Sequence, residues 1–355
     1  MKQLFKNFTK ISNKRFIQYA LGLVLSKEKS SCTKIAKIFG ICHDSIYKIL
    51  SKMGTLLNLF PVLMISVVKY FSKQKKGYLI IDDTAMVKPF SRKLPGVFDV
   101  FDTIFGRTER GFRKVVLAWS NGHATIPIKF SWIFHKDLVG KDYKTKSELA
   151  RVLILFCLKH DIKFTHILFD AHYSTIELMQ FLQKMRIKFV AKIPCNRKVT
   201  TKNGEFEQLK KLSCLKLFRN KRSNVIEAVY HGMGLYFSVH KRKNKNGEYS
   251  CVYIVSNICL HEKIYLKIYN QRWDIEKMFR TIKQLLGLNQ CFSTKLERQE
   301  AHIYFVFFSY SFLENEKYKK NFINPETSAR LLREAKLEDA LSCITSFSEN
   351  FQCSA

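Results

Sequence analysis

Two short apolar segments that each end in an aspartate constrain the fold of this chain more than any other feature of its sequence. The first, GYLIIDDT, covers residues 77–84 and ends in the acids Asp82 and Asp83. The second, THILFDAHYST, covers residues 165–175 and contains Asp170. An apolar run of this length is typical of a buried strand. Such a strand places its terminal carboxylate at the edge of a sheet, which is where metal sites are commonly built.

The segments around these two strands predict a mixed sheet with helices on its faces. Residues 114–134 have the pattern of a hairpin with its turn at 120–122, and residues 91–112 before it indicate an irregular loop. An amphipathic helix is expected over residues 144–160, a second helix follows the second aspartate, and residues 188–194 form one more strand. This order of elements predicts an α/β fold.

The run YNQRWDIEKMFRTIK at residues 269–283 predicts a helix with a narrow polar face. The run has no Gly or Pro, and its apolar residues recur at helical spacing. At about 100° per residue, four polar side chains share a face roughly 60° wide, whereas Asp274 points about 140° away. The four are Tyr269, Arg272, Glu276 and Lys283. A carboxylate flanked by cations suits a phosphodiester, although a solvated charged face with i,i+4 pairs has the same pattern.

The charge of the chain restricts its class of partner. The 355 residues include 61 Lys and Arg against 29 Asp and Glu, which gives a formal net charge of +32. A surplus of this size indicates a polyanionic partner, most simply nucleic acid. With 46% hydrophobic residues, the chain has enough apolar side chains for a core, which excludes a disordered basic tail.

The cysteines, the N-terminus and the apolar runs all indicate an intracellular protein. None of the ten cysteines forms a CxxC pair or a Cys/His cluster with zinc spacing, so we expect free thiols in a reducing cytoplasm. No N-terminal segment has the architecture of a signal peptide. The longest apolar stretches, near 56–68 and 303–313, are too short or too interrupted to span a bilayer. We expect a cytoplasmic, nucleoid-associated protein.

Changes in composition divide the chain into five segments. Residues 1–72 are expected to form a helical DNA-binding domain, and residues 77–194 and 251–315 to form the two parts of the α/β domain. Residues 195–250, which are basic and less regular, are expected to be a β-rich insertion. Residues 316–355 are expected to be a helical tail.

Within the first segment, the run TKIAKIFGICHDSIYKIL at residues 33–50 has the pattern of a helix-turn-helix. Ala36 is small enough for two helices to approach each other, and Gly40 permits the turn between them. The second helix would then present Tyr47 and Lys48 outward, toward a major groove. A small helical hairpin without DNA contacts has the same pattern.

Three acids form the candidate catalytic set: Asp82 and Asp170 at strand ends, and Glu276 on the helix. Three carboxylates that a fold brings together can hold two divalent ions about 3.5–4 Å apart. One ion would activate a water or a 3′-hydroxyl, and the other would stabilise the leaving oxygen. Spacing alone leaves open that the three acids are unrelated.

These residues resemble those of the insertion-sequence DDE transposases. The positions Tyr269, Arg272, Glu276 and Lys283 match the Y-(2)-R-(3)-E-(6)-K signature of that family without a gap. The runs IIDDT and ILFDAHYST resemble its two aspartate blocks, in the expected order and on the expected kind of strand. The resemblance covers roughly residues 77–315, and the helical N-terminus is similar to the end-binding region of such proteins.

The resemblance implies an RNase H-like catalytic domain, interrupted by a β-rich insertion before the helix that carries the glutamate. It also implies a reaction that depends on two Mg²⁺ ions, or on Mn²⁺ in their place: cleavage at the transposon ends, then attack of the freed 3′-hydroxyl on target DNA. The expected partners are the terminal inverted repeats and target DNA, bound by a homodimer on paired ends.

The resemblance also implies a role for each matched residue. The metal ligands would be Asp82, Asp170 and Glu276. Phosphate contacts would come from Tyr269, Arg272 and Lys283, and Trp273 would stack on a displaced base. Asp82 is preferred to Asp83 because the metal ligand of related strands directly follows the apolar run, and because neighbouring residues on a strand face opposite ways.

Two alternative functions use the same residues. A domesticated or inactive transposase would keep the fold and the charge and act only as a DNA-binding protein. A metal-dependent nuclease would cut DNA without joining strands.

Overall fold

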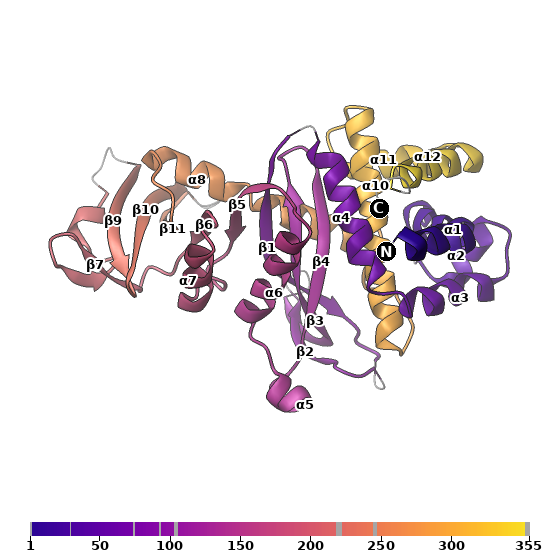
Figure 1. The fold of residues 1–355 in the computed structure, drawn as a ribbon, viewed down its shortest axis with the longest axis horizontal. Coiled ribbons are helices and arrows are strands. Elements are labelled where there is room, and N and C mark those ends of the chain that lie inside the picture. The colour runs from indigo at the N-terminus through magenta and orange to yellow at the C-terminus, as the bar shows by residue number, and fades with distance from the viewer. Residues whose placement is uncertain are drawn as a thin grey trace.

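A computed structural model of the chain describes residues 2–28, 30–73, 75–91, 94–102, 106–217, 222–243 and 247–351, with side chains from residue 14 onward. Figure 1 shows three regions side by side: the strands that carry the predicted acids in the middle, a smaller group of strands on one side, and packed helices on the other.

The described helices and strands follow one another in this order: α1 (Lys2–Leu25), α2 (Cys32–Ile38), α3 (His43–Gly54), α4 (Leu59–Ser72), β1 (Gly77–Val87), β2 (Phe98–Asp102), β3 (Arg107–Ser120), β4 (Thr125–Ile133), α5 (Lys136–Val139), α6 (Lys146–Lys159), β5 (Phe164–Phe169), α7 (Ile176–Lys184), β6 (Phe189–Lys192), β7 (Lys198–Thr201), β8 (Phe206–Gln208), β9 (Ser223–Tyr230), β10 (Met233–Lys243), β11 (Tyr249–Ser256), α8 (Glu262–Asn270), α9 (Trp273–Gln284), α10 (Leu296–Lys319), α11 (Pro325–Glu334) and α12 (Leu337–Glu349).

The strands form one mixed sheet in the order β2-β3-β1-β5-β6-β11-β10-β9-β7-β8, with β4 paired to β3. β1 is antiparallel to β3 and parallel to β5, and β5 is parallel to β6. This arrangement confirms the predicted mixed α/β fold and is consistent with an RNase H-like domain. β7 to β10 lie within the segment that was expected to be a β-rich insertion, and β11 joins them to β6.

Local sequence explains where several of these elements begin and turn. Gly122 has a φ of 84° in the turn between β3 and β4, and Asn121 Oδ1 accepts hydrogen bonds from the two backbone N–H groups that follow the turn. The predicted hairpin is therefore confirmed. Thr145 and Glu148 form a reciprocal capping box at the start of α6. Gly40, with a φ of 60°, makes the turn between α2 and α3, as the sequence predicts.

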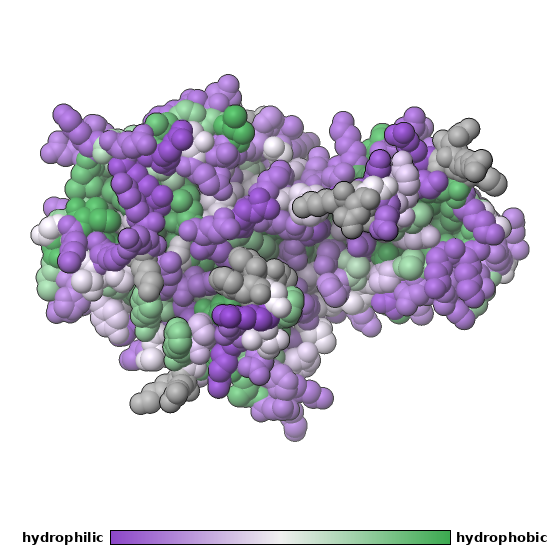
Figure 2. Space-filling view, turned by 180° about the vertical axis from the view of Figure 1, so that it is seen from behind, coloured by the Kyte–Doolittle hydropathy of each residue, from purple (hydrophilic) through white to green (hydrophobic). Residues whose placement is uncertain are grey.

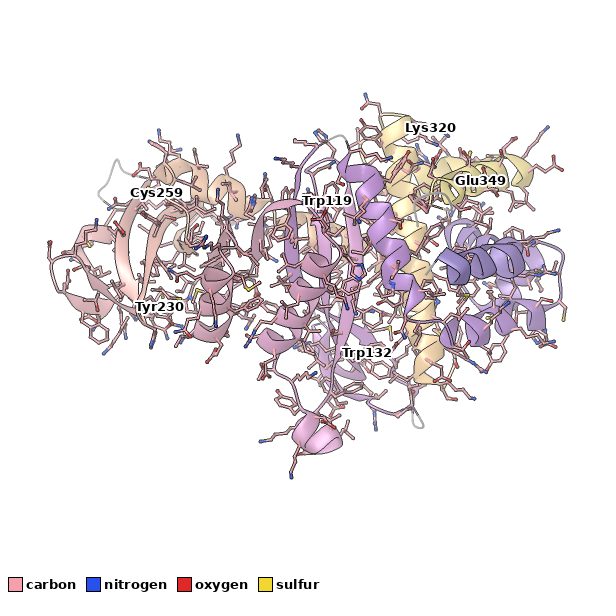
Figure 3. All side chains as sticks on the ribbon, in the orientation of Figure 1. Trp119, Trp132, Tyr230, Cys259, Lys320 and Glu349 are labelled. Atoms are coloured by element: carbon pink, nitrogen blue, oxygen red, sulfur yellow. The ribbon has the colours of Figure 1, made fainter. Side chains whose placement is uncertain are left out.

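Helix α10 lies between the sheet and helices α1 to α3, whereas α4 packs directly beside β4 (Figure 1). Every residue of α10 from Ala301 to Glu316 is buried. Its side chains contact both neighbours: the ring of Phe16 lies 4.8 Å from that of Phe305, and Trp132 of β4 donates a hydrogen bond of 2.7 Å to Glu300. Figure 3 labels Trp132 at this junction. The N-terminal helices therefore share one hydrophobic core with the sheet.

Three sequence predictions need correction. The first strand was expected to end at Asp82 and Asp83, but β1 continues to Val87 because its second half also pairs with β3. Residues 91–112 were expected to be a loop, but they include β2, which is an edge strand, and the start of its partner β3. Residues 269–283 were expected to form one helix, but α8 ends at Asn270 and α9 begins at Trp273. Between them, the N–H groups of Gln271 and Arg272 bond to carbonyls only three residues back. A 3₁₀ turn advances each side chain by about 120° rather than 100°, so the predicted common face does not continue through it.

The surface is predominantly polar. Figure 2 shows hydrophilic side chains over most of one face, with smaller hydrophobic patches between them. This agrees with the net charge of +32. Among the described residues, no single helix has the length and hydropathy to cross a membrane; α3 and α4 reach that length and hydropathy only as a pair bent by 90°.

Candidate active site

Asp82 lies within β1, and Asp170 directly follows β5, the parallel neighbour of β1. Ile81 of β1 pairs with Phe169 of β5, so the residue after each of them is an aspartate at the same level of the sheet. Burial raises the pKa of the Asp82 carboxyl to about 7; the Arg272 guanidinium opposes this rise, and the charges of Asp170 and Asp83 add to it. The Asp82 side chain is therefore desolvated and lies within the field of a second carboxylate.

Asp83 has different partners from those of Asp82. Its Oδ1 accepts a hydrogen bond of 2.8 Å from Lys146 Nζ and one of 3.2 Å from the Tyr173 hydroxyl, and its Oδ2 lies 3.3 Å from Arg113 Nε. Two cations and a phenol thus compensate the charge of Asp83. This arrangement is the usual one for a structural carboxylate that is mostly buried.

Arg272 lies between the first and the third predicted acids. Its Nη1 is 2.8 Å from Asp82 Oδ2, and its Nη2 forms an ion pair with Glu276 Oε1. Only 9% of Arg272 is exposed, and its Nε has no hydrogen-bond partner among the described residues. The tight turn between α8 and α9 directs this side chain at β1. The structure thus connects Asp82 and Glu276 through one guanidinium.

Two aromatic residues flank Arg272. The guanidinium carbon lies 5.7 Å from the centre of the Tyr269 ring and 5.9 Å from that of Trp273. Burial raises the pKa of Tyr269, which keeps its phenol protonated as a possible hydrogen-bond donor. Trp273 is 39% exposed, and Arg242 of β10 also lies 5.9 Å from its ring.

The remaining predicted residues lie apart from this cluster. Lys283 is partly exposed and lies two turns further along α9 than Glu276. Lys48 is exposed on α3. Tyr47, also on α3, contacts α10: Arg298 lies 4.5 Å from the centre of its ring and donates a hydrogen bond to its hydroxyl.

The comparison with protein families places these residues in context. The family model described as "Transposase DDE domain" matches residues 74–312. The chain belongs to the transposase DDE-domain family. The match runs from the start of β1 through most of α10, so it includes Asp82, Asp170, Arg272 and Glu276. A search of curated proteins gave no match to this chain.

Membership in the DDE-domain family implies a DNA nuclease or transposase enzyme that uses divalent metal ions. Carboxylate oxygens are the ligands that Mg²⁺ prefers, so the chemistry of the donor set fits such ions. Among the described residues, however, no three His, Cys, Asp or Glu side chains lie close enough together to hold an ion. The guanidinium of Arg272 lies between Asp82 and Glu276 and forms an ion pair with each of them.

Sequence reasoning missed the residue that fixes α9 on the sheet of the DDE domain. The Oδ2 atom of Asp274 accepts hydrogen bonds from the Tyr78 hydroxyl of β1, at 2.7 Å, and from the Ser120 hydroxyl of β3, at 3.0 Å. Tyr78 lies on the same strand as Asp82, and Asp274 precedes Glu276 by two residues. This contact therefore helps to set the position of Glu276 relative to Asp82.

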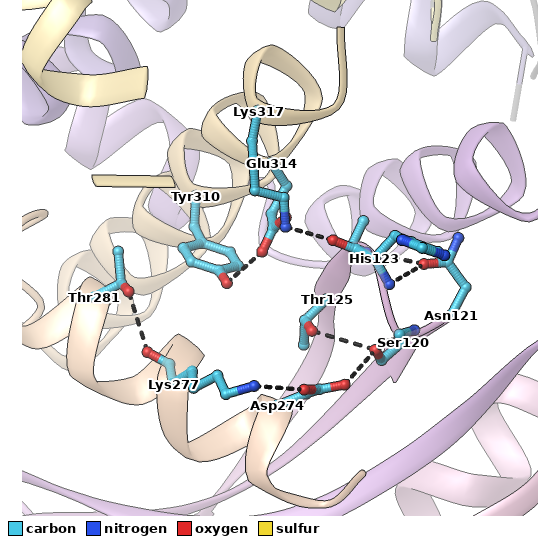
Figure 4. Close-up of polar contacts among 12 residues, drawn as sticks. Ser120, Asn121, His123, Thr125, Asp274, Lys277, Thr281, Tyr310, Glu314 and Lys317 are labelled. Carbon is cyan, nitrogen blue, oxygen red and sulfur yellow. Dashed lines mark hydrogen bonds and ion pairs between the residues drawn. The ribbon is translucent and has the colours of Figure 1, made fainter. Parts of the chain in front are cut away.

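Asp274 belongs to a polar network that Figure 4 shows. It joins α9 to the turn between β3 and β4 and, through Lys317 and the carbonyl of His123, to α10. On α10, Glu314 pairs with Lys317 and accepts a hydrogen bond of 2.6 Å from Tyr310. No local spacing signals these contacts, because Asp274 is 196 and 154 residues away from its two partners in sequence.

Proposed function

We propose that this chain is a transposase of the Y-(2)-R-(3)-E-(6)-K group, which cuts DNA at the ends of an insertion sequence and joins the freed 3′-hydroxyl to target DNA. The observation that carries the proposal is the contact of Arg272 with both Asp82 and Glu276, beside Asp170 and inside the segment that matches the DDE domain. A purely structural role does not explain why one buried arginine pairs with two acids of this segment beside a third.

Asp82, Asp170 and Glu276 are the residues that would hold the metal ions in this mechanism. When bound, two Mg²⁺ or Mn²⁺ ions lower the pKa of an attacking water or 3′-hydroxyl and stabilise the leaving oxygen. The surrounding residues of the chain bind and orient the DNA. Arg272 and Lys283 donate to phosphate oxygens, Tyr269 donates through its phenol, and Trp273 offers an exposed ring for stacking.

Recognition of the DNA ends is the proposed role of the N-terminal helices. Helices α2 and α3 would act as a helix-turn-helix, and Lys48 is exposed on the second of them. Tyr47 would reach DNA from the same helix while Arg298 holds its hydroxyl. The partners in this proposal are terminal inverted repeats and target DNA, bound by a homodimer in the nucleoid-containing cytoplasm.

Lys283→Ala is expected to weaken the binding of repeat-end DNA and to reduce its dependence on salt. Each phosphate that a cation neutralises contributes about −0.9 to the slope of log K against log salt concentration for duplex DNA. The variant should therefore bind with a slope shallower by about one, as measured by fluorescence anisotropy at several salt concentrations. Arg280→Ala is the matched control, because Arg280 is an exposed cation on the same helix and is not one of the predicted phosphate contacts. Equal slopes for Lys283→Ala and the wild type would count against a phosphate contact.

Strand joining is the step that distinguishes the proposed function from its alternatives. The experiment supplies repeat-end DNA that is already cut and has a free 3′-hydroxyl, together with supercoiled target plasmid and Mg²⁺. A transposase joins the two molecules. A nuclease degrades or nicks the DNA without joined products, and a protein that only binds DNA does neither.

A further inference from the structure

A second site lies at the C-terminal end of α9, beyond Lys283. It is a cavity of about 420 Å³ between the end of β1, with the residues that follow it, and the loop that joins α9 to α10. This volume lies within the range of about 300–1,000 Å³ that is usual for pockets that hold small molecules. None of the residues that line this cavity has a predicted role in metal binding or in the recognition of DNA ends.

Two exposed phenyl rings line the cavity. Phe90 is 95% exposed and Phe292 is 71% exposed, which is unusual for large apolar side chains. One ring follows β1, and the other belongs to the loop before α10, so they reach the cavity from two segments that are far apart in sequence. Exposed aromatic faces are the usual platform on which bases stack.

Two residues that line the cavity have a buried hydrogen-bond acceptor without a partner among the described residues. Gln299 is only 1% exposed, and its Nε2 donates to the carbonyls of Cys291, at 3.1 Å, and Ser293, at 2.5 Å. These two bonds fix the orientation of the amide, and its Oε1 has no partner among the described residues. Asn289 Oδ1 is also buried and unpaired among them. A buried acceptor without a donor is costly, so this wall of the cavity favours a ligand with N–H groups.

The side chain of Lys88 holds the cavity in shape. Lys88 is buried, and its Nζ donates to the carbonyls of Asn289, at 2.8 Å, and Cys291, at 2.6 Å, which ties the loop to the end of β1.

We propose that this cavity receives an unstacked base of the bound DNA, held between Phe90 and Phe292 and hydrogen-bonded through its N–H groups to Gln299 and Asn289. The proposal rests on the proposed function, because it requires DNA along α9. Aromatic platforms and unpaired acceptors match the ring faces and the amino or imino groups of a nucleotide base. The base is distinct from any that stacks on Trp273, which lies at the opposite end of α9.

The position of the cavity predicts which base it takes. Lys283 lies seven residues after Glu276, or about 10 Å along the helix axis. Successive phosphates of one strand are about 3.4 Å apart along the duplex axis. The base in the cavity should therefore lie within about five nucleotides of the phosphate that is cut.

The test uses 2-aminopurine, a base analogue whose fluorescence rises when it leaves the stack. Repeat-end duplexes carry the analogue at one position at a time, and the full-length protein is added without divalent metal so that no cleavage occurs. We expect one position near the cut phosphate to brighten several-fold on binding. Phe90→Ala and Phe292→Ala should each remove most of this rise, and Gln299→Leu should reduce it. Both phenylalanines are exposed, so their variants are expected to fold, which circular dichroism verifies.

Phe206→Ala is the matched control and should leave the signal unchanged. Phe206 is a 64% exposed ring on β8, and β8 is separated by six strands in the sheet order from β1, which borders the cavity. If the wild type binds repeat-end DNA tightly but no 2-aminopurine position brightens, the proposed base pocket is wrong and the proposed function is not affected. Brightening that depends on Trp273 and not on Phe90 or Phe292 would also overturn the pocket. Failure of the wild type to bind repeat-end DNA would contradict both the pocket and the proposed function.

Discussion

Asp82→Asn is expected to abolish Mg²⁺-dependent DNA cleavage, whereas Asp83→Asn is expected to leave most of it. The Asp82 carboxyl is buried beside Asp170 and contacts Arg272, while Asp83 is compensated by Lys146 and Arg113. Loss of a metal ligand removes several kcal/mol of transition-state stabilisation, which corresponds to a fall of about a thousandfold in rate. The measurement is single-turnover cleavage of repeat-end DNA.

The two variants are matched in chemistry and differ by one position in the chain, so each is the control for the other. Asp83→Asn should instead lower the free energy of unfolding, by about 1–3 kcal/mol, because it weakens hydrogen bonds to charged groups. Both proteins should bind the DNA end. Loss of cleavage in Asp83→Asn with activity retained in Asp82→Asn would reverse the assignment of the metal ligand.

Arg272→Gln is expected to bind Mn²⁺ in the absence of DNA at least tenfold more tightly than the wild type. In the wild type, a buried guanidinium pairs with both Asp82 and Glu276, so a metal ion must first displace it. Glutamine removes the positive charge and leaves the two carboxylates without a counter-ion, which favours the binding of a metal cation. Titration of free Mn²⁺ by electron paramagnetic resonance measures the affinity without any requirement for catalysis.

Thermal unfolding gives a second measure of the same effect. Arg272→Gln should unfold at a lower temperature than the wild type without metal and should gain more stability from added Mn²⁺, because a ligand stabilises the folded state according to its affinity. Arg280→Gln is the matched control, since Arg280 is an exposed arginine on the same helix. Equal Mn²⁺ affinities for the wild type and Arg272→Gln would show that Arg272 does not compete with the metal.

The contact of Arg272 with the acids also predicts coupling between the two ligands of the wild type. A DNA phosphate offers the guanidinium another partner, and its unpaired Nε is available for that bond. DNA should therefore raise the affinity of the wild type for Mn²⁺, and metal should raise its affinity for DNA by the same factor.

The sequence predicts much of this arrangement because several of its signals are local. Apolar runs that end in acids indicate β1 and β5, and the turn at residues 120–122 indicates the hairpin of β3 and β4. The regular spacing of Ile275, Met278 and Ile282 indicates a helix, and all three are buried in α9. The Y-(2)-R-(3)-E-(6)-K spacing adds the residues that surround Glu276, although their roles in DNA binding and metal binding stay predictions.

The features that the sequence does not predict depend on contacts between distant segments. The turn between α8 and α9 has no Gly or Pro to mark it, and it directs Arg272 at an acid 190 residues earlier in the chain. In the sequence, Asp274 looks like an exposed helical acid, because its partners Tyr78 and Ser120 are far away along the chain and contact it only in the folded structure. β2 lacks a clear strand pattern because it forms only as the edge partner of β3. The periodicity of apolar residues indicates which face of a helix or strand is buried, but it does not indicate which residues of distant segments contact that face.

The most direct test of the account is a cleavage assay with the repeats that flank the gene, in Mg²⁺, with Glu276→Gln alongside the wild type. The wild type is predicted to nick the DNA at the repeat ends and then to join the freed strand to target DNA. Glu276→Gln is predicted to bind the same DNA with similar affinity and to cut none of it. Cleavage by Glu276→Gln at the rate of the wild type would contradict the assignment of this glutamate and, with it, the proposed active site.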